Sequence, residues 1–133
     1  MLRDCTASEM AESALVMPVI LLVIMLVING LMAGYTGLSA AAAADAGARA
    51  GARAAKLPDV AANNAAWTSI DHTRMGGKYG VSAQVDDQAG GAVKVMVAWQ
   101  YPSILSGLCR FFGGGCKPYF EGFSVSTHKR EGW

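Results

Sequence analysis

The feature that most constrains this chain is an uncharged apolar run from Ala14 to Ile28, which Asn29 interrupts and residues 31–35 continue. A helix of about 20 apolar residues spans a bilayer core of about 30 Å. Pro18 falls in the first turn or two of such a helix, where its missing N–H costs little. The run therefore predicts a transmembrane helix that begins at residue 14.

A cleaved secretory signal is the alternative interpretation of this run. The apolar core of a signal peptide is usually about 7–15 residues long and follows a basic segment. Residues 1–13 instead contain one basic residue, Arg3, and the acidic residues Asp4, Glu9 and Glu12, so this segment is net acidic. We expect the helix to be retained, with residues 1–13 as an N-terminal leader or cytoplasmic flank.

The helix is expected to continue past the membrane as an alanine-rich helix. Residues 38–56 read LSAAAAADAGARAGARAAK, and alanine is the best helix former. Asp45, Arg49 and Arg53 follow one another at intervals of four, and the Asp45–Arg49 pair has the favourable order on a helix. Residues 14–56 are therefore predicted to form one transmembrane and alanine-rich helix.

Two glycine pairs lie on this segment, Gly30 with Gly34 and Gly47 with Gly51. Small residues four positions apart allow another helix to approach closely. The four glycines are therefore candidate assembly residues. A bias of a GC-rich genome toward glycine and alanine is the alternative explanation, and the sequence does not decide between the two.

Residues 57–133 predict a small α+β domain. Pro58 should break the chain between the first helix and a second one from Asp59 to Met75, with Val60, Trp67 and Ile70 as its core contacts. Alternating apolar residues predict strands in YGVSAQVDD, AVKVMVAWQYP and FEGFSVSTHKRE, and QAGG predicts a hairpin loop. The expected fold class is α+β: a long N-terminal transmembrane helix, a second helix and a small three-stranded antiparallel sheet.

The alternation also assigns faces to the predicted strands. One face of each strand would hold, in turn, Val81, Ala83 and Val85; Val93, Val95, Val97, Trp99 and Tyr101; and Phe123, Val125 and Thr127. Aromatic residues cluster late in the chain, and we expect them to form the core of the domain: Trp99, Tyr101, Phe111, Phe112, Tyr119, Phe120 and Phe123.

Cys109 and Cys116 bracket RFFGGG, and a spacer with three glycines can fold back to the Cα separation of about 5.5–6 Å that a disulfide needs. A zinc site is the alternative, but only His72 and His128 remain as further ligands, without the usual spacing. We predict the disulfide, and with it an oxidising, extracytoplasmic compartment for residues 57–133.

The positive charges favour the opposite orientation. Arg49, Arg53 and Lys56 follow the apolar run, and positively charged flanks tend to stay in the cytoplasm. These residues lie on a helix that would continue about 20 Å past the membrane. We therefore give the cysteine pair more weight.

Motifs of catalysis are absent from the sequence. The net charge of +1 suggests no nucleic-acid partner, and we find no nucleophile motif, phosphate loop or dinucleotide fingerprint. Asp71 and His72 are adjacent, and adjacent residues on a helix do not face each other. His128 is expected to be a polar tail residue. We expect no enzyme activity, no catalytic residues, no cofactor and no metal.

The segment AESALVMPVILLVIM resembles the N-terminus of TadE-like proteins, pilin-like subunits of tight-adherence (type IVc, Flp) pilus systems. That family shows a glutamate, an apolar run and a proline six residues after the glutamate, as Glu12 and Pro18 do here. AAAADAGARAGARAA is similar to the family's alanine- and arginine-rich segment, and FSVSTHKREGW looks like its terminal strand and tail. The resemblance is good over about residues 8–56 and loose beyond them.

By this resemblance, Glu12 matches the glutamate with which pilin-like proteins meet the free amino group of a neighbouring subunit. A carboxylate in hydrocarbon needs such a cation; the alternative is that Glu12 marks the water-facing end of the helix. Processing in such families follows a glycine five residues before the glutamate. That position is Ala7 here, followed by Ser8, and Ser13 stands where the family usually has an aromatic residue. Ala7 and Ser8 are the candidate processing site.

The resemblance implies a structural, membrane-anchored minor pilin or pseudopilin that takes part in assembly of a Flp-type pilus. Its expected partners are other pilin-like subunits through the N-terminal helix, the pilus assembly machinery and the membrane. Its expected place is the bacterial inner membrane, single-pass, with incorporation in a surface pilus. Two alternatives stay open: the main repeating subunit of an extracellular filament, and a single-pass periplasmic binding module unrelated to pili.

Overall fold

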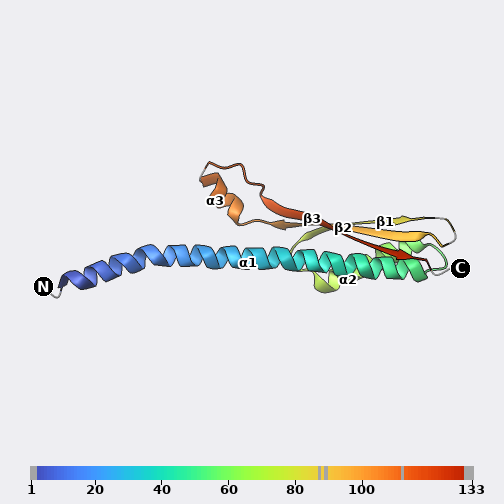
Figure 1. The fold of residues 1–133 in the computed structure, drawn as a ribbon, viewed down its shortest axis with the longest axis horizontal. Coiled ribbons are helices and arrows are strands. Elements are labelled where there is room, and N and C mark those ends of the chain that lie inside the picture. Colours follow the sequence, from blue (N-terminus) through green and yellow to red (C-terminus); the bar gives the residue numbers. More distant parts are fainter. Residues whose placement is uncertain (1–2, 87, 89, 112, 131–133) are drawn as a thin grey trace.

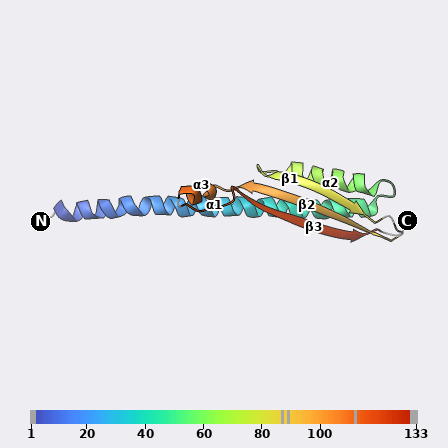
Figure 2. The same ribbon diagram turned by 90° about the horizontal axis from the view of Figure 1, so that it is seen from above.

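Two helices cover one face of a three-stranded antiparallel sheet in the computed structural model, which describes residues 3–86, 88, 90–111 and 113–130 (Figures 1 and 2). The element order is α1 (Arg3–Arg53), α2 (Pro58–Thr73), β1 (Lys78–Val85), β2 (Ala92–Pro102), α3 (Leu105–Phe111) and β3 (Tyr119–Lys129). The strands pair in the order β1-β2-β3. The α+β class, the two leading helices and the antiparallel sheet are as predicted.

Helix α1 is continuous over 51 residues, so the helix shows no break at the predicted boundary between residues 13 and 14. The helix begins earlier than predicted, which places Pro18 inside it rather than in its first turns. Pro18 cannot donate to the carbonyl of Ala14, and a proline at such a position bends a helix. Figure 1 shows the N-terminal end of α1 inclined to the rest of the helix.

Helix α2 runs back along α1 after a short connection. Leu57 adopts a left-handed conformation with φ 51°, and Pro58 is the first residue of α2, as its fixed φ favours. The break at Pro58 is therefore confirmed, although α1 ends at Arg53 rather than at residue 56.

The core lies between α1, α2 and the central strand β2. Its α1 and α2 members are almost all alanine, and they face three valines of β2: Ala40, Ala43, Ala44, Ala48, Ala62, Ala66, Ile70, Val93, Val95 and Val97. Because alanine is short, the helix backbones and the sheet approach closely, and their contact excludes water without large side chains.

Two predicted core contacts of α2 are wrong. Ile70 is buried, but Val60 is 45 % and Trp67 is 40 % exposed. The buried stripe of α2 is Ala62, Ala66 and Ile70, and its two alanines lie where α2 approaches the glycines of α1 closely.

The predicted sheet faces are confirmed for β1 and β2. The inward face of β2 begins with Val93, Val95 and Val97, and β1 packs its own inward face against the same core. In β3, Phe123, Val125 and Thr127 do share a face, but this face is exposed. The inward face of β3 is small and polar: Gly122, Ser124, Ser126 and His128.

The expectation of an aromatic core is mostly wrong. Trp99 packs against the core, where a Cβ on Gly122 would lie 2.7 Å from its ring and a Cβ on Gly37 would lie 3.2 Å from it. Phe111 is 86 % and Phe123 is 72 % exposed. Tyr119 is also exposed, Tyr101 and Phe120 are half-buried, and Phe112 lies outside the described residues. The two glycines make room for this indole, and Tyr79 of β1 is a second ring that packs against the core.

Candidate assembly and membrane surface

Helix α1 divides into two parts with different surroundings. Its C-terminal part packs against α2 and the sheet, whereas large apolar side chains from Leu15 to Ile28 are exposed. Only 6 % of its most apolar 18-residue window is buried, so this part is not the core helix of a soluble domain. Among the described residues, this is one helix long and apolar enough to span a membrane.

Glu12 lies at the N-terminal end of this exposed apolar surface and is itself exposed. It shares a shallow hollow with Ser13, Val16, Met17 and Ile20. No side chain that the structure describes forms an ion pair with Glu12. Its carboxylate is therefore available to a cation from outside the described chain.

The candidate processing residues Ala7 and Ser8 lie early in α1, within its helical backbone. Their side chains lie outside what the structure describes. Their predicted role in processing therefore stays a prediction.

The two glycine pairs have different surroundings. A Cβ on Gly47 would lie 2.8 Å from the carbonyl oxygen of Ala62, and a Cβ on Gly51 would lie 2.8 Å from Val93 and 2.9 Å from Ala62. A helix does approach these glycines closely, but it is α2 of the same chain. We therefore revise their predicted role, because both glycines are buried inside the monomer.

Gly30 and Gly34, in contrast, are open. Apart from the neighbouring turns of α1 itself, no atom of the described residues lies within 4 Å of a Cβ built on either glycine. They line an apolar groove together with Leu31, Met32, Tyr35, Leu38 and Met75. This surface, the Gly30–Gly34 groove, is where a neighbouring helix could approach α1, and it directly continues the exposed apolar part of the helix.

A polar clamp marks the point where the domain begins to contact α1. The side-chain nitrogen of Asn29 donates to the carbonyl oxygen of Pro102 (3.3 Å), and the side-chain oxygen of Asn29 accepts from the backbone N–H of Ile104 (3.3 Å). Asn29 is only 2 % exposed. The residue that interrupts the apolar run thus holds the end of β2 and the start of the α3 segment.

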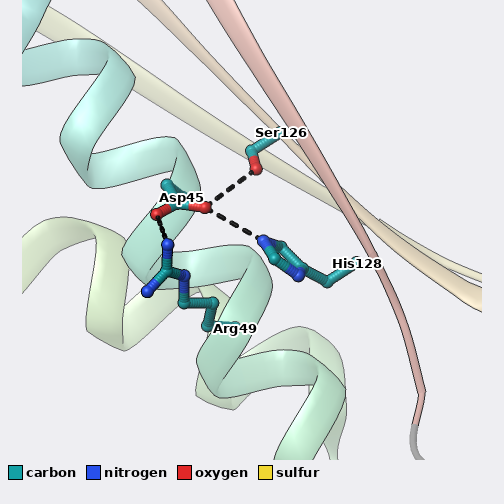
Figure 3. A network of polar contacts seen from close by, with 4 residues as sticks. All are labelled: Asp45, Arg49, Ser126 and His128. Atoms are coloured by element: carbon teal, nitrogen blue, oxygen red, sulfur yellow. Dashed lines mark hydrogen bonds and ion pairs between the residues drawn. The ribbon is translucent and has the colours of Figure 1, made fainter.

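A second polar network holds the other end of the sheet to α1 (Figure 3). The carboxylate of Asp45 binds Arg49 Nη2 at 2.7 Å through one oxygen, and His128 Nε2 at 2.9 Å and Ser126 Oγ at 3.4 Å through the other. The hydrogen bond to His128, followed by the charge of Arg49, holds the pKa of Asp45 below its ordinary value. The predicted Asp45–Arg49 pair is confirmed. His128 is not a tail residue but a member of β3 that contacts α1.

The predicted disulfide between Cys109 and Cys116 is present, with a Cα–Cα distance of 5.8 Å. It joins the last turns of α3 to the loop before β3. The bond excludes the zinc alternative at these cysteines. The described residues contain no group of three or more metal-ligating side chains.

Residues 8–49 match a protein-family model described as TadE-like protein. The similarity to TadE-like proteins lies within α1. The TadE-like segment covers both the exposed apolar part of α1 and most of its alanine-rich core part, including Glu12, Asn29 and Asp45. Neither the curated proteins nor the solved structures contain a match to the chain.

The sequence alone does not predict the roles of several residues that organise this part of α1. Asn29 interrupts the apolar run with no predicted partner, and Ser39, which shares a 2.8 Å hydrogen bond with the hydroxyl of Tyr79, has no predicted role. The helix α3 was not predicted either. A signal existed for Asn29 and Ser39, since a polar residue on the core-facing side of an apolar helix requires a partner.

Proposed function

We propose that the chain is a membrane-anchored minor pilin or pseudopilin that takes part in assembly of a Flp-type pilus, with a structural rather than a catalytic role. The TadE-like match supports involvement in a tight-adherence pilus system. The observation that carries the proposal is the division of α1, one continuous helix with an exposed apolar part and an alanine part that forms the domain core.

Such an exposed apolar surface must be covered outside the monomer. Lipid can cover it while the chain is a single-pass membrane protein, and helices of other pilin-like subunits can cover it after assembly. The open Gly30–Gly34 groove suits close helix packing. Because the C-terminal part of α1 is fixed in its own domain, assembly can proceed without unfolding that domain.

In this proposal, the carboxylate of Glu12 pairs with a cation on a neighbouring subunit. A carboxylate that moves into a helix bundle needs a cation, and the free amino group of a neighbouring subunit is such a cation. In this chain the amino group would be that of Ser8, if cleavage follows Ala7. The disulfide in the domain supports an extracytoplasmic domain and therefore an N-terminus on the cytoplasmic side.

The test compares Glu12→Gln with the unchanged chain in cells that make the pilus. The amide keeps the shape and removes the charge, so membrane insertion should be intact while recovery with the other pilus components falls. Asp59→Asn is the matched control, because Asp59 is exposed on α2, away from the apolar surface. Equal recovery of Glu12→Gln and the control would show that Glu12 only marks the membrane boundary.

A further inference from the structure

The segment around α3 presents apolar side chains on one side. Leu108 and Phe111 of α3, together with Ile104 directly before the helix, are spaced at i, i+4 and i+7, the spacing of one helical stripe. All three are exposed, by 55 %, 39 % and 86 %. A small helix with its apolar stripe facing out needs a cover from outside the domain.

The stripe lies beside the exposed apolar part of α1, and this position indicates what covers its side chains. Ile104 and Leu108 line one small crevice with Leu22, Met25 and Leu26 of α1, with a volume of about 50 Å³. These α1 residues belong to the candidate membrane-spanning surface. Ile104 and Leu108 thus continue the exposed apolar surface of α1, and Figure 1 shows α3 beyond the end of the sheet that is nearer the N-terminus of α1.

The depth can be estimated from the rise of α1. From Glu12 to Asn29 the helix extends about 26 Å at about 1.5 Å per residue, close to the thickness of a bilayer core. If Asn29 lies at the edge of that core, Leu26 and Leu22 lie about 5 and 10 Å inside it. This range matches the depth of about 5–10 Å to which interfacial helices bury their apolar faces.

We infer that α3 is a membrane-surface element whose Ile104–Leu108–Phe111 stripe lies among lipid acyl chains at the boundary on the domain side of the bilayer. The inference rests on the proposed membrane anchoring of α1. It assigns bilayer lipid, rather than a protein, as the partner of this stripe.

Several backbone polar groups around α3 have hydrogen-bond partners within the protein, as a position near hydrocarbon requires. Polar backbone groups are costly near hydrocarbon unless they are bonded within the protein. The side chain of Asn29 bonds the carbonyl of Pro102 and the N–H of Ile104, and the N–H of Gly114 donates to the carbonyl of Cys109 at 2.8 Å. The disulfide closes the same loop. Arg110 is exposed, and its long side chain can reach the lipid headgroups.

The test uses the full chain reconstituted in phosphatidylethanolamine–phosphatidylglycerol vesicles, with the photoreactive residue p-benzoylphenylalanine at one position. Phe111 is the test position, and Phe123 is the matched control, since it is also an exposed phenylalanine but lies on the outer face of the sheet. Val19, exposed on the apolar part of α1, reports anchoring itself. Peptide mapping confirms the Cys109–Cys116 bond in each variant, so a misfolded loop is recognised.

We expect phospholipid adducts at positions 111 and 19. We expect no phospholipid adduct at position 123. Adducts at 19 but not at 111 would overturn the inference and leave the membrane anchor standing. A lack of lipid adducts at both positions would contradict the anchor and the inference together. Adducts from position 111 to a second protein chain, in place of lipid, would assign the stripe to a subunit contact and overturn the inference.

Discussion

At the scale of single residues, a few polar side chains of α1 determine where the domain sits on the helix. Asn29 binds the end of β2, Ser39 binds Tyr79 of β1 and Asp45 binds His128 of β3. Each of the three positions bonds a different strand, so together they fix the direction of the sheet along α1. The alanines between these residues allow close contact with the sheet, but their short apolar side chains do little to fix its direction along α1.

Asp45→Asn should make the stability of the domain less dependent on acid pH. Because the pKa of Asp45 is lowered in the folded state by His128 and then by Arg49, its contribution is fully present above the unfolded value near 3.8 and is lost as pH falls through the folded value. The variant should therefore be less stable at neutral pH and lose less stability on acidification. Thermal unfolding in detergent between neutral and acid pH measures this.

Asp71→Asn is the control for this series, since Asp71 is exposed on α2. It should keep the acid dependence of the unchanged chain. Parallel pH profiles for Asp45→Asn and the unchanged chain would rule out a role for the network in stability.

Gly51→Ala should destabilise the domain by about 1–3 kcal/mol, the usual effect of overpacking a close contact. Its Cβ would lie 2.8 Å from Val93 and 2.9 Å from the carbonyl oxygen of Pro58, which is backbone and cannot rotate away. Gly34→Ala is the matched control, because no described residue outside the neighbouring turns of α1 lies within 4 Å of its Cβ, and alanine favours the helix. Chemical unfolding in detergent should separate the two, and equal stabilities would show that α2 does not pack at Gly51 as described.

At the scale of elements, hydrophobic patterning and chain breakers predicted the long helix, the second helix, the three strands and the Pro58 break. The strongest signals were the apolar run, the alanine run and the alternating valines of β2. The faces were harder to predict. The apolar character of Val60 and Trp67 predicts core contacts, yet α2 buries Ala62, Ala66 and Ile70, because the separation of two helices is a tertiary property that no local pattern contains.

Helix α3 illustrates a second limit. It spans Leu105–Phe111, too short for periodicity to separate it from a loop. Its position beside Leu22 and Leu26 depends on the course of β2 along α1, which the local sequence does not encode.

Loss of the Cys109–Cys116 bond should destabilise the α3 loop. Closing so short a loop restricts the unfolded chain and contributes about 2–3 kcal/mol. The variant with Cys109→Ser and Cys116→Ser should lower the free energy of unfolding by that order, and non-reducing peptide mapping of the unchanged chain should recover the linked pair. Free thiols at both positions in protein from native envelopes would contradict the bond.

At the scale of the whole molecule, the N-terminal part of α1 is an exposed apolar helix, and the rest of α1 belongs to a small domain. The sequence predicts the apolar part of α1, because a long apolar run is a strong compositional signal, but it does not predict that the alanine-rich part of α1 forms the core of the domain. The sequence does not predict that Gly47 and Gly51 are in close contact with α2 of the same chain while Gly30 and Gly34 are exposed. That distinction depends on how far α2 extends along α1, and it narrows the candidate assembly surface to the exposed part of the helix.

The orientation of the whole molecule is also testable. A reporter active only outside the cytoplasm, fused after Trp133, should be active, and a reporter active only inside should be silent at the same position. The expectation rests on the disulfide, which persists in oxidising compartments. The reverse pair of results would support the orientation that the positive charges of Arg49, Arg53 and Lys56 favour.

The central claim is that the exposed apolar part of α1 joins a bundle of pilin-like helices. The most direct measurement places p-benzoylphenylalanine at Leu31, which is 68 % exposed beside Gly30 and Gly34, and irradiates cells that assemble the pilus. The proposed function predicts a covalent adduct between this chain and a second pilin-like chain. Adducts with phospholipid alone, in cells whose pili assemble normally, would contradict it.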